Sequence, residues 1–298
     1  MSSKIEWKGA YTALVTPFDA AGEIDWAAYE ALVERQIAGG IAGLVPCGTT
    51  GETPTLTETE QVEMVRRTVA VARGRATVLA GTGSFSTKKT IEASRRALEA
   101  GADAVMIVMP YYSKPTQEGL VQHLTAVAAA VDAPVVLYNV PGRSGVDLGV
   151  EATERVCAAA ANVVATKEAT GNVIRCQELK RRLGDRLAVL SGDDALTLPM
   201  MAVGATGVIS VTSNLLPGAV SEVVRLALAG DFAAARAKHL ALLPVHDAMF
   251  LEANPGPVKT ALALAGHQRA DVRLPLVPVA EATRRQLAAV LAAYEGRA

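Results

Sequence analysis

Residues 163–171 read VVATKEATG, a short β-branched run that ends in a lysine and is soon followed by a glycine. A strand buried on both faces of a parallel sheet has this continuous apolar pattern, and the glycine indicates a turn. Lysine is rare in such a strand, because burying an unpaired ammonium group costs free energy. Lys167 therefore either marks the strand end with its amine in water or has a chemical role.

The same alternation of a short apolar run and a helical pattern recurs along most of the chain, at a repeat of roughly 30 residues that is typical of a βαβ unit. Asp25 is predicted to cap the first helix, and Thr57 with Glu60 forms a capping box for the second. The predicted strands are 10–18, 42–45, 76–80, 104–108, 134–138, 163–167, 187–190 and 207–211. The predicted helices are 25–38, 57–72, 87–100, 116–130, 150–160, 173–183, 194–203 and one from about 215.

Eight such units predict a closed (β/α)₈ TIM barrel of the α/β class rather than an open doubly wound sheet. We expect residues 1–230 to form the barrel with the catalytic site. Residues 231–298 are expected to form a C-terminal helical region packed on the barrel, with helices near 232–250, 257–265 and 279–294. In such barrels the site lies at the C-terminal ends of the strands, which favours a chemical role for Lys167.

Composition narrows the possible functions. The 298 residues carry a net charge of −1, which gives no electrostatic footprint for nucleic acid or an anionic membrane. No apolar run is long enough to span a bilayer, and the N-terminus lacks the apolar core of a signal peptide. The three cysteines and four histidines show no disulfide or metal-ligand spacing. We therefore expect a cytoplasmic protein without a metal, a nucleic-acid partner or a membrane partner.

Several polar residues follow the predicted strands. The segment 48–52, GTTGE, follows the second strand, and its hydroxyls and N–H groups could bind an anion or simply form a connecting loop. Tyr111 and Tyr112 follow the fourth strand, and Tyr138 ends the fifth before Arg143. Each tyrosine could equally be a packing residue, and Arg143 a solvated surface charge.

Two further groups near the strand ends have simpler interpretations. Asp193 and Asp194 are expected to cap a helix rather than bind a metal. Cys47 is expected to be a small buried wall residue.

Taken together, a lysine, a tyrosine, a hydroxyl-rich loop and an arginine suit Schiff-base carbon–carbon chemistry on a keto acid. A desolvated amine loses its proton more readily and can attack a ketone. The resulting iminium withdraws electrons from the neighbouring carbon, where a tyrosine can move protons.

The chain also resembles the pyruvate-dependent class I aldolases of the dihydrodipicolinate synthase and N-acetylneuraminate lyase family over nearly its whole length. Each matching motif is weak alone, but their order along the chain is specific. The motifs are TALVTPF at 12–18, GTTGE at 48–52, PYY at 110–112, YNVPGRSG at 138–145, KEATGN at 167–172, SGDD at 191–194, GVISV at 207–211, NP at 254–255 and PVK at 257–259.

The resemblance implies that Lys167 forms the Schiff base with pyruvate and that Tyr138 is the general acid and base. Thr49 would link Tyr138 to Tyr112 in a proton relay, with the Tyr112 hydroxyl supplied by the neighbouring subunit of a tight dimer. The implied assembly is a homotetramer built as a dimer of dimers, and no cofactor is implied.

The resemblance also assigns the binding of substrates. Thr49 and Thr50 would hold the pyruvate carboxylate, with the main chain of Ile209 and Gly192 beside the pocket. Arg143 would bind the carboxylate of L-aspartate 4-semialdehyde. The implied product is 4-hydroxy-tetrahydrodipicolinate, in lysine and diaminopimelate biosynthesis.

Two other interpretations stay open. The same lysine chemistry could serve a pyruvate-dependent aldolase or dehydratase that acts on a 2-keto-3-deoxy sugar acid or sialic acid. A barrel of this kind could also bind a keto acid without turnover, because a fold alone does not prove activity.

Lysine-inhibited members of the family resemble one another in an effector pocket at the tight-dimer interface. At the corresponding positions this chain has Glu58, Gln61, Phe85 and Lys89, and it retains Tyr111. Lys89 would repel the ammonium groups of lysine, and Phe85 offers no hydrogen bond. We therefore expect no inhibition by lysine in the sub-millimolar range.

Overall fold

Eight parallel strands close into a barrel in the computed structural model, which describes residues 5–296. Each strand pairs with the next, and β8 pairs with β1 through contacts such as Tyr11 with Ile209. This closure confirms the predicted (β/α)₈ barrel. The strands are β1 (Gly9–Ala13), β2 (Gly43–Val45), β3 (Thr77–Gly81), β4 (Ala104–Val108), β5 (Val135–Asn139), β6 (Val163–Glu168), β7 (Ala188–Ser191) and β8 (Gly207–Ser210).

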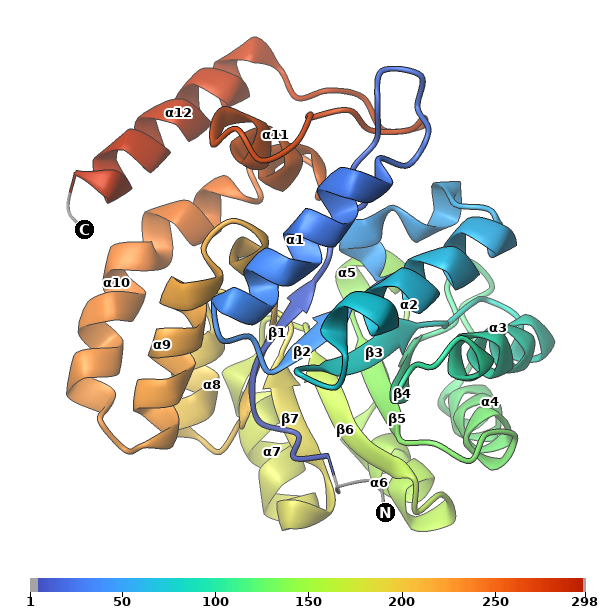
Figure 1. Ribbon diagram of the computed structural model, residues 1–298. Helices are drawn as coiled ribbons and strands as arrows, with labels where there is room; N and C mark the ends of the chain where they lie inside the picture. The colour runs from blue at the N-terminus through green and yellow to red at the C-terminus, as the bar shows by residue number, and fades with distance from the viewer. Residues whose placement is uncertain (1–4, 297–298) are drawn as a thin grey trace.

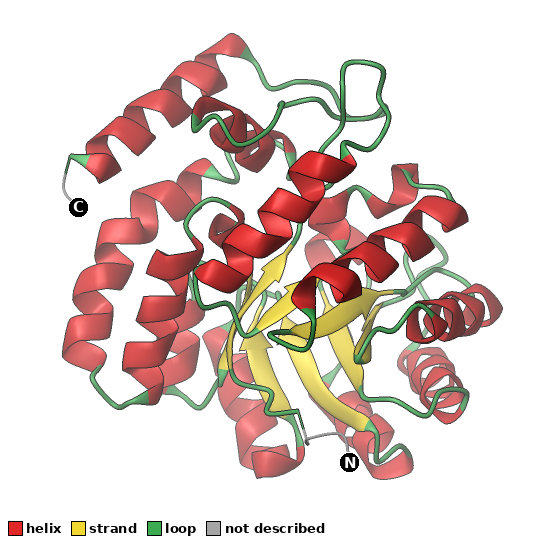
Figure 2. Cartoon of the chain, in the orientation of Figure 1, coloured by secondary structure: helices red, strands yellow, loops and turns green. Residues whose placement is uncertain are grey.

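Helices surround the barrel, as Figures 1 and 2 show. Those between the strands and after β8 are α1 (Trp26–Ala38), α2 (Glu58–Ala72), α3 (Thr87–Glu99), α4 (Gln117–Ala129), α5 (Pro141–Ser144), α6 (Val150–Ala159), α7 (Val173–Leu183), α8 (Thr197–Ala202) and α9 (Pro217–Leu228). Single 3₁₀ turns are η1 (Thr49–Gly51), η2 (Thr53–Thr55), η3 (Gly184–Arg186) and η4 (Thr212–Asn214).

The predicted N-caps form for the first two helices. The Asp25 carboxylate accepts a hydrogen bond from the backbone N–H of Ala28 at 3.0 Å. Thr57 and Glu60 make both bonds of the capping box at the start of α2. These side chains satisfy N–H groups that the first helical turn cannot pair by itself, so the helix starts are encoded locally.

Two predicted elements are wrong in extent. The first strand ends at Ala13, and Phe18 instead pairs with Ile24 in an isolated antiparallel bridge. An apolar run does not distinguish a barrel strand from a buried segment that leaves the barrel. The helix predicted for 194–203 begins only at Thr197 and has no side-chain cap.

Small and medium side chains fill the interior of the barrel together with two tyrosines. Tyr11 closes the end where the strands begin, and Tyr138 lies toward the end where they finish. Apolar residues between the sheet and the helices form the larger part of the core. The interior cluster is Tyr11, Ala13, Val45, Leu79, Ala104, Met106, Val136, Tyr138, Val140, Ala165, Leu190 and Ile209.

The C-terminal region is helical, as expected. It contains α10 (Phe232–Ala248), α11 (Gly256–Leu264) and α12 (Glu281–Glu295). Helix α10 packs against α8 and α9, and α12 packs against α10 and α11 (Figure 1). The boundary at residues 230 and 231 stays a prediction, and residues 297–298 of the predicted region lie outside the described part. None of the described helices is long and apolar enough to cross a membrane.

Candidate active site

Lys167 and Tyr138 lie on neighbouring strands, because the register of β5 and β6 pairs these two residues directly. The lysine is only 4% exposed, and its Nζ lies 4.3 Å from the centroid of the Tyr138 ring. Within residues 5–296 it is the one lysine in a strand, and it has no hydrogen bond or salt bridge there. The side chain of Lys167 is therefore largely buried, and its amine has no protein partner within the described residues that would compete with a substrate.

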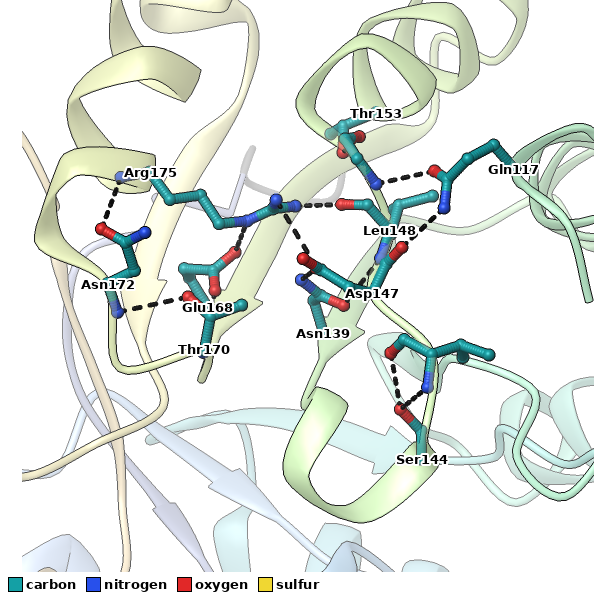
Figure 3. Close-up of polar contacts among 12 residues, drawn as sticks. Gln117, Asn139, Ser144, Asp147, Leu148, Thr153, Glu168, Thr170, Asn172 and Arg175 are labelled. Carbon is teal, nitrogen blue, oxygen red and sulfur yellow. Dashed lines mark hydrogen bonds and ion pairs between the residues drawn. The ribbon is translucent and has the colours of Figure 1, made fainter. Parts of the chain in front are cut away.

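The carboxylate next to this lysine in the sequence does not neutralise it. Side chains alternate across a strand, and Glu168 is engaged away from Lys167. Its Oε2 lies 2.7 Å from Nε of Arg175, and its Oε1 accepts a hydrogen bond from the backbone N–H of Thr170 at 2.9 Å (Figure 3). Arg175 thus holds the negative charge of Glu168.

A cavity of about 500 Å³ opens beside Tyr138, among the loops that follow β2 to β5. Thr49 and Arg143 line it with Tyr138, so the structure brings together three of the predicted site residues. Lys167 is not itself a lining residue and meets the cavity through its neighbour Tyr138. Cys47 also lines the cavity, and burial raises the pKa of its thiol to about 12. Cys47 is therefore a small buried wall residue, as predicted.

The GTTGE segment forms the 3₁₀ turn η1 at the mouth of the barrel. Thr49 is half-buried, whereas Thr50 is only 2% exposed. The Thr50 Oγ1 accepts a hydrogen bond from Nδ2 of Asn254 at 3.0 Å. A hydroxyl has one hydrogen to donate and can also accept, so this contact leaves the Thr50 hydrogen free for an anion.

Asn254 and Lys259 belong to the matching motifs of the sequence, but their support of this segment was not predicted. Nζ of Lys259 lies 2.6 Å from Oε1 of Glu52, and both side chains are fully buried. The ammonium also donates to the carbonyl of Thr16 at 2.8 Å and lies over the Phe18 ring. The signal that could have found it is a lysine within the apolar sequence of α11, which needs a buried partner.

Three other predicted site residues, Ile209, Gly192 and Tyr112, do not line this cavity. Ile209 is fully buried in β8, within the barrel interior. Gly192 follows β7, and its N–H donates to the carbonyl of Glu168 at 2.7 Å. Tyr112 is 94% exposed and does not line the cavity of its own chain. The structure therefore does not bring Tyr112 to Tyr138 within one subunit.

The prediction that Asp194 caps a helix is wrong. Its buried carboxylate accepts hydrogen bonds from the Ser210 hydroxyl and from the N–H groups of Val211 and Thr212. Asp194 thus fixes the end of β8 instead. Asp193 accepts a bond from the N–H of Ala195 in the turn before α8. The partners of Asp194 belong to the next strand and the turn after it, so the sequence pattern around Asp194 does not reveal them.

A (β/α)₈ barrel with a largely buried lysine at the end of its sixth strand is the arrangement expected of a class I lyase, an enzyme that acts through a lysine amine. The comparison with known families agrees with this class. The chain belongs to the dihydrodipicolinate synthetase family, whose model matches residues 6–294.

Individual relatives cover nearly the whole chain. The 4-hydroxy-tetrahydrodipicolinate synthase of Sorangium cellulosum (strain So ce56) is 66% identical over 99% of this chain and 98% of its own. The solved synthase of Methylacidiphilum fumariolicum SolV is 45% identical, with a TM-score of 0.96 over 98% of this chain and 97% of its own. Another solved structure, described as a monomeric dihydrodipicolinate synthase variant, is 40% identical, with a TM-score of 0.94 over 97% of each chain.

Proposed function

We propose that the protein condenses pyruvate with L-aspartate 4-semialdehyde to give 4-hydroxy-tetrahydrodipicolinate, as the names of its relatives indicate for those enzymes. The observation that carries this proposal is the contact between Tyr138 and the buried Lys167, which has no hydrogen bond or salt bridge within residues 5–296. Tyr138 in turn lines a cavity together with Arg143.

Lys167 starts the reaction as the nucleophile. Its amine attacks the C2 carbonyl of pyruvate, and loss of one water gives an iminium. Removal of a proton from C3 gives an enamine, which forms the new carbon–carbon bond to the aldehyde carbon of the second substrate. The amino group of that substrate then displaces Lys167 from C2 and closes the ring. Lysine is regenerated, and one water is lost overall.

Tyr138 is the proton carrier in this proposal. The ring contact with Lys167 supports this role, because a substrate bound to the lysine would have its reacting carbon atoms near the tyrosine. Thr49 lines the same cavity and is the proposed link that returns the proton to bulk water. The pyruvate carboxylate would be bound by the Thr50 hydroxyl, as hydrogen-bond donor, and by N–H groups of the same loop. The main chain of Ile209 and Gly192 would lie beside the bound pyruvate.

Arg143 is the proposed ligand for the carboxylate of the aldehyde. Its side chain is exposed at the cavity wall and has no salt bridge within residues 5–296, so its guanidinium is available to a bidentate anion.

We expect Arg143→Ala to lower kcat/KM for aspartate semialdehyde roughly tenfold to a hundredfold, because a hydrogen bond to a charged group contributes about 1.5–3 kcal/mol. Trapping of pyruvate by borohydride should be unchanged. The same assay with sugar-derived aldehydes tests the alternative substrates. An unchanged kcat/KM for aspartate semialdehyde, with turnover of a sugar aldehyde, would favour the sugar-acid aldolase. Trapping without turnover of any aldehyde would favour the binding protein.

Tyr112 supports a proposed assembly of two or more subunits. The residue is exposed and has a positive φ of 72°, a strained conformation for tyrosine that needs an external reason. We propose that it enters the cavity of a neighbouring subunit and completes the relay from Tyr138 through Thr49. The full assembly in this proposal is a dimer of dimers in the cytoplasm.

Sedimentation at the assay concentration should therefore show at least a dimer. Tyr112→Phe should lower kcat while the trapping of pyruvate continues, because only the proton relay loses a hydroxyl. A monomer with full activity would contradict the shared site.

Inhibition by lysine is expected to be absent. The residues predicted to replace the effector ligands, including Lys89, Phe85 and Glu58, line the same cavity as Tyr138. Nζ of Lys89 lies 5.6 Å from the Phe85 ring centroid, and Glu58 is paired with Arg96 at 3.3 Å. Initial rates with added lysine should show half-inhibition only above about 1 mM, which corresponds to a site weaker than about −4 kcal/mol. Half-inhibition at a lower concentration would show a working effector site.

A further inference from the structure

The loop of residues 140–148, which carries Arg143, is tied at its base by one side chain. Asn139 ends β5 and is 1% exposed. Its Nδ2 donates to Oδ1 of Asp147 at 2.7 Å, and its Oδ1 accepts from the N–H of Leu148 at 3.1 Å. Both ends of the loop therefore meet at the amide of Asn139, directly after Tyr138 (Figure 3).

Arg175 of α7 also contacts the end of this loop, at Asp147 and Leu148, from outside the barrel. Its guanidinium bonds Glu168 at 2.7 Å, lies 3.5 Å from Oδ1 of Asp147 and donates to the carbonyl of Leu148 (Figure 3). The side chains of Arg175 and Glu168 are 11% and 1% exposed, so the contact is largely removed from water. It joins the residue after Lys167 to the end of the Arg143 loop.

A third contact comes from α4. The side-chain amide of Gln117 donates to the carbonyl of Asp147 at 2.7 Å and accepts from the N–H of Gly149 at 2.8 Å. Within the loop, the Ser144 hydroxyl donates to the carbonyl of Val146 at 2.9 Å. These contacts fix the backbone around Arg143, while the arginine side chain makes no hydrogen bond or salt bridge to the described part of the chain.

We propose that Asn139, Asp147 and Arg175 form a loop latch that positions Arg143 for the aldehyde substrate. This inference rests on the proposed function of Arg143. A pre-positioned cation binds a carboxylate better than one on a mobile loop, because the ordering cost is met in folding rather than in binding. None of the three latch residues lines the cavity, so in this proposal they act through Arg143.

The first test is Asp147→Ala. The Asp147 side chain is 53% exposed, so its removal should not prevent folding. We expect KM for aspartate semialdehyde to rise about fivefold to tenfold, as for other coupled contacts. KM for pyruvate and the rate of borohydride trapping should be unchanged. Asp147→Asn keeps an acceptor for Asn139 and should lie closer to the parent enzyme than Asp147→Ala.

A double variant distinguishes positioning from a general structural effect. In the Arg143→Ala background, Asp147→Ala should cause no further rise in KM for the aldehyde, because the group it positions is absent. Full additivity of the two changes, or an unchanged KM in Asp147→Ala alone, would overturn the latch. If Arg143→Ala itself leaves kcat/KM for aspartate semialdehyde unchanged, the proposed role of Arg143 is wrong, and the latch proposal is wrong with it.

Arg182 offers a matched control on the same helix. It also pairs with glutamates, at 2.9 Å to Glu178 and 3.2 Å to Glu154, but these pairs lie on the outer surface. Arg182→Ala should leave both KM values unchanged. Arg175→Lys should keep the charge beside Glu168 yet raise KM for the aldehyde, because one ammonium cannot reproduce the forked contacts of a guanidinium. If Arg182→Ala and Arg175→Lys change KM for the aldehyde equally, the specific role proposed for Arg175 is wrong.

Discussion

Replacing Lys167 with alanine is expected to abolish the trapping of pyruvate by borohydride. The reduction traps only an iminium between a protein amine and the ketone, so the loss of that amine removes the product. Lys167 has the required geometry, because it is buried, unpaired and in contact with Tyr138. Condensation activity should fall to the background level in the same variant.

The structure contains a second buried lysine, which makes the site of the adduct a sharp test. Lys259 is fully buried, but Glu52 and the carbonyl of Thr16 hold its ammonium group. Peptide mapping by mass spectrometry should therefore find the adduct on Lys167 and not on Lys259. An adduct on Lys259, or full trapping in Lys167→Ala, would show that the assignment is wrong.

Lys167→Arg provides a control for folding. The guanidinium keeps a positive charge at the strand end but cannot form the iminium, since it stays protonated. We expect no trapping in this variant and a thermal transition closer to that of the parent than for Lys167→Ala.

The second large effect is expected on stability. Lys259→Met should lower the free energy of unfolding by about 3–5 kcal/mol, because it leaves the carboxylate of Glu52 buried without its cation. The backbone N–H of Arg273 still donates to Oε2 of Glu52 at 3.0 Å, but a neutral donor does not replace the charge. Denaturation by urea at one fixed protein concentration measures the change.

A variant that lacks both charges distinguishes the electrostatic contribution of the ion pair from the contribution of packing. Lys259→Met combined with Glu52→Gln should recover much of the lost stability, since a buried ion pair contributes less than the damage done by breaking it. Arg225→Ala, which removes an exposed pair with Glu222, should cause little change. A loss for Lys259→Met no larger than that for Arg225→Ala would refute the importance of the buried pair.

Much of the fold could be predicted because its signals are local. Strand β4 and helix α7 have the predicted bounds, since their apolar periodicity and flanking turn residues are clear. The first strand was predicted too long, because residues 14–18 are as apolar as a strand but leave the barrel toward the C-terminal helices. Their partners lie far away in the sequence: the N–H of Val15 donates to Oδ1 of Asn214, and Lys259 lies over the Phe18 ring.

Part of the candidate site could likewise be predicted from the sequence. The chain itself determined that Lys167, Tyr138 and Arg143 gather at one end of a barrel, because the ends of parallel strands share an edge whatever the details of packing. Resemblance to a family then supplied the individual roles.

Only the tertiary structure decided which buried charges are paired. Glu168 pairs with Arg175 and Glu52 pairs with Lys259, whereas Lys167 has no hydrogen bond or salt bridge within residues 5–296. Pairing depends on distances of a few ångströms between residues that can be 207 positions apart, as Glu52 and Lys259 are. The periodicity and spacing of residues in the sequence carry no information about pairs so far apart along the chain. The energy of a buried charge, however, depends directly on its distance in space from the opposite charge.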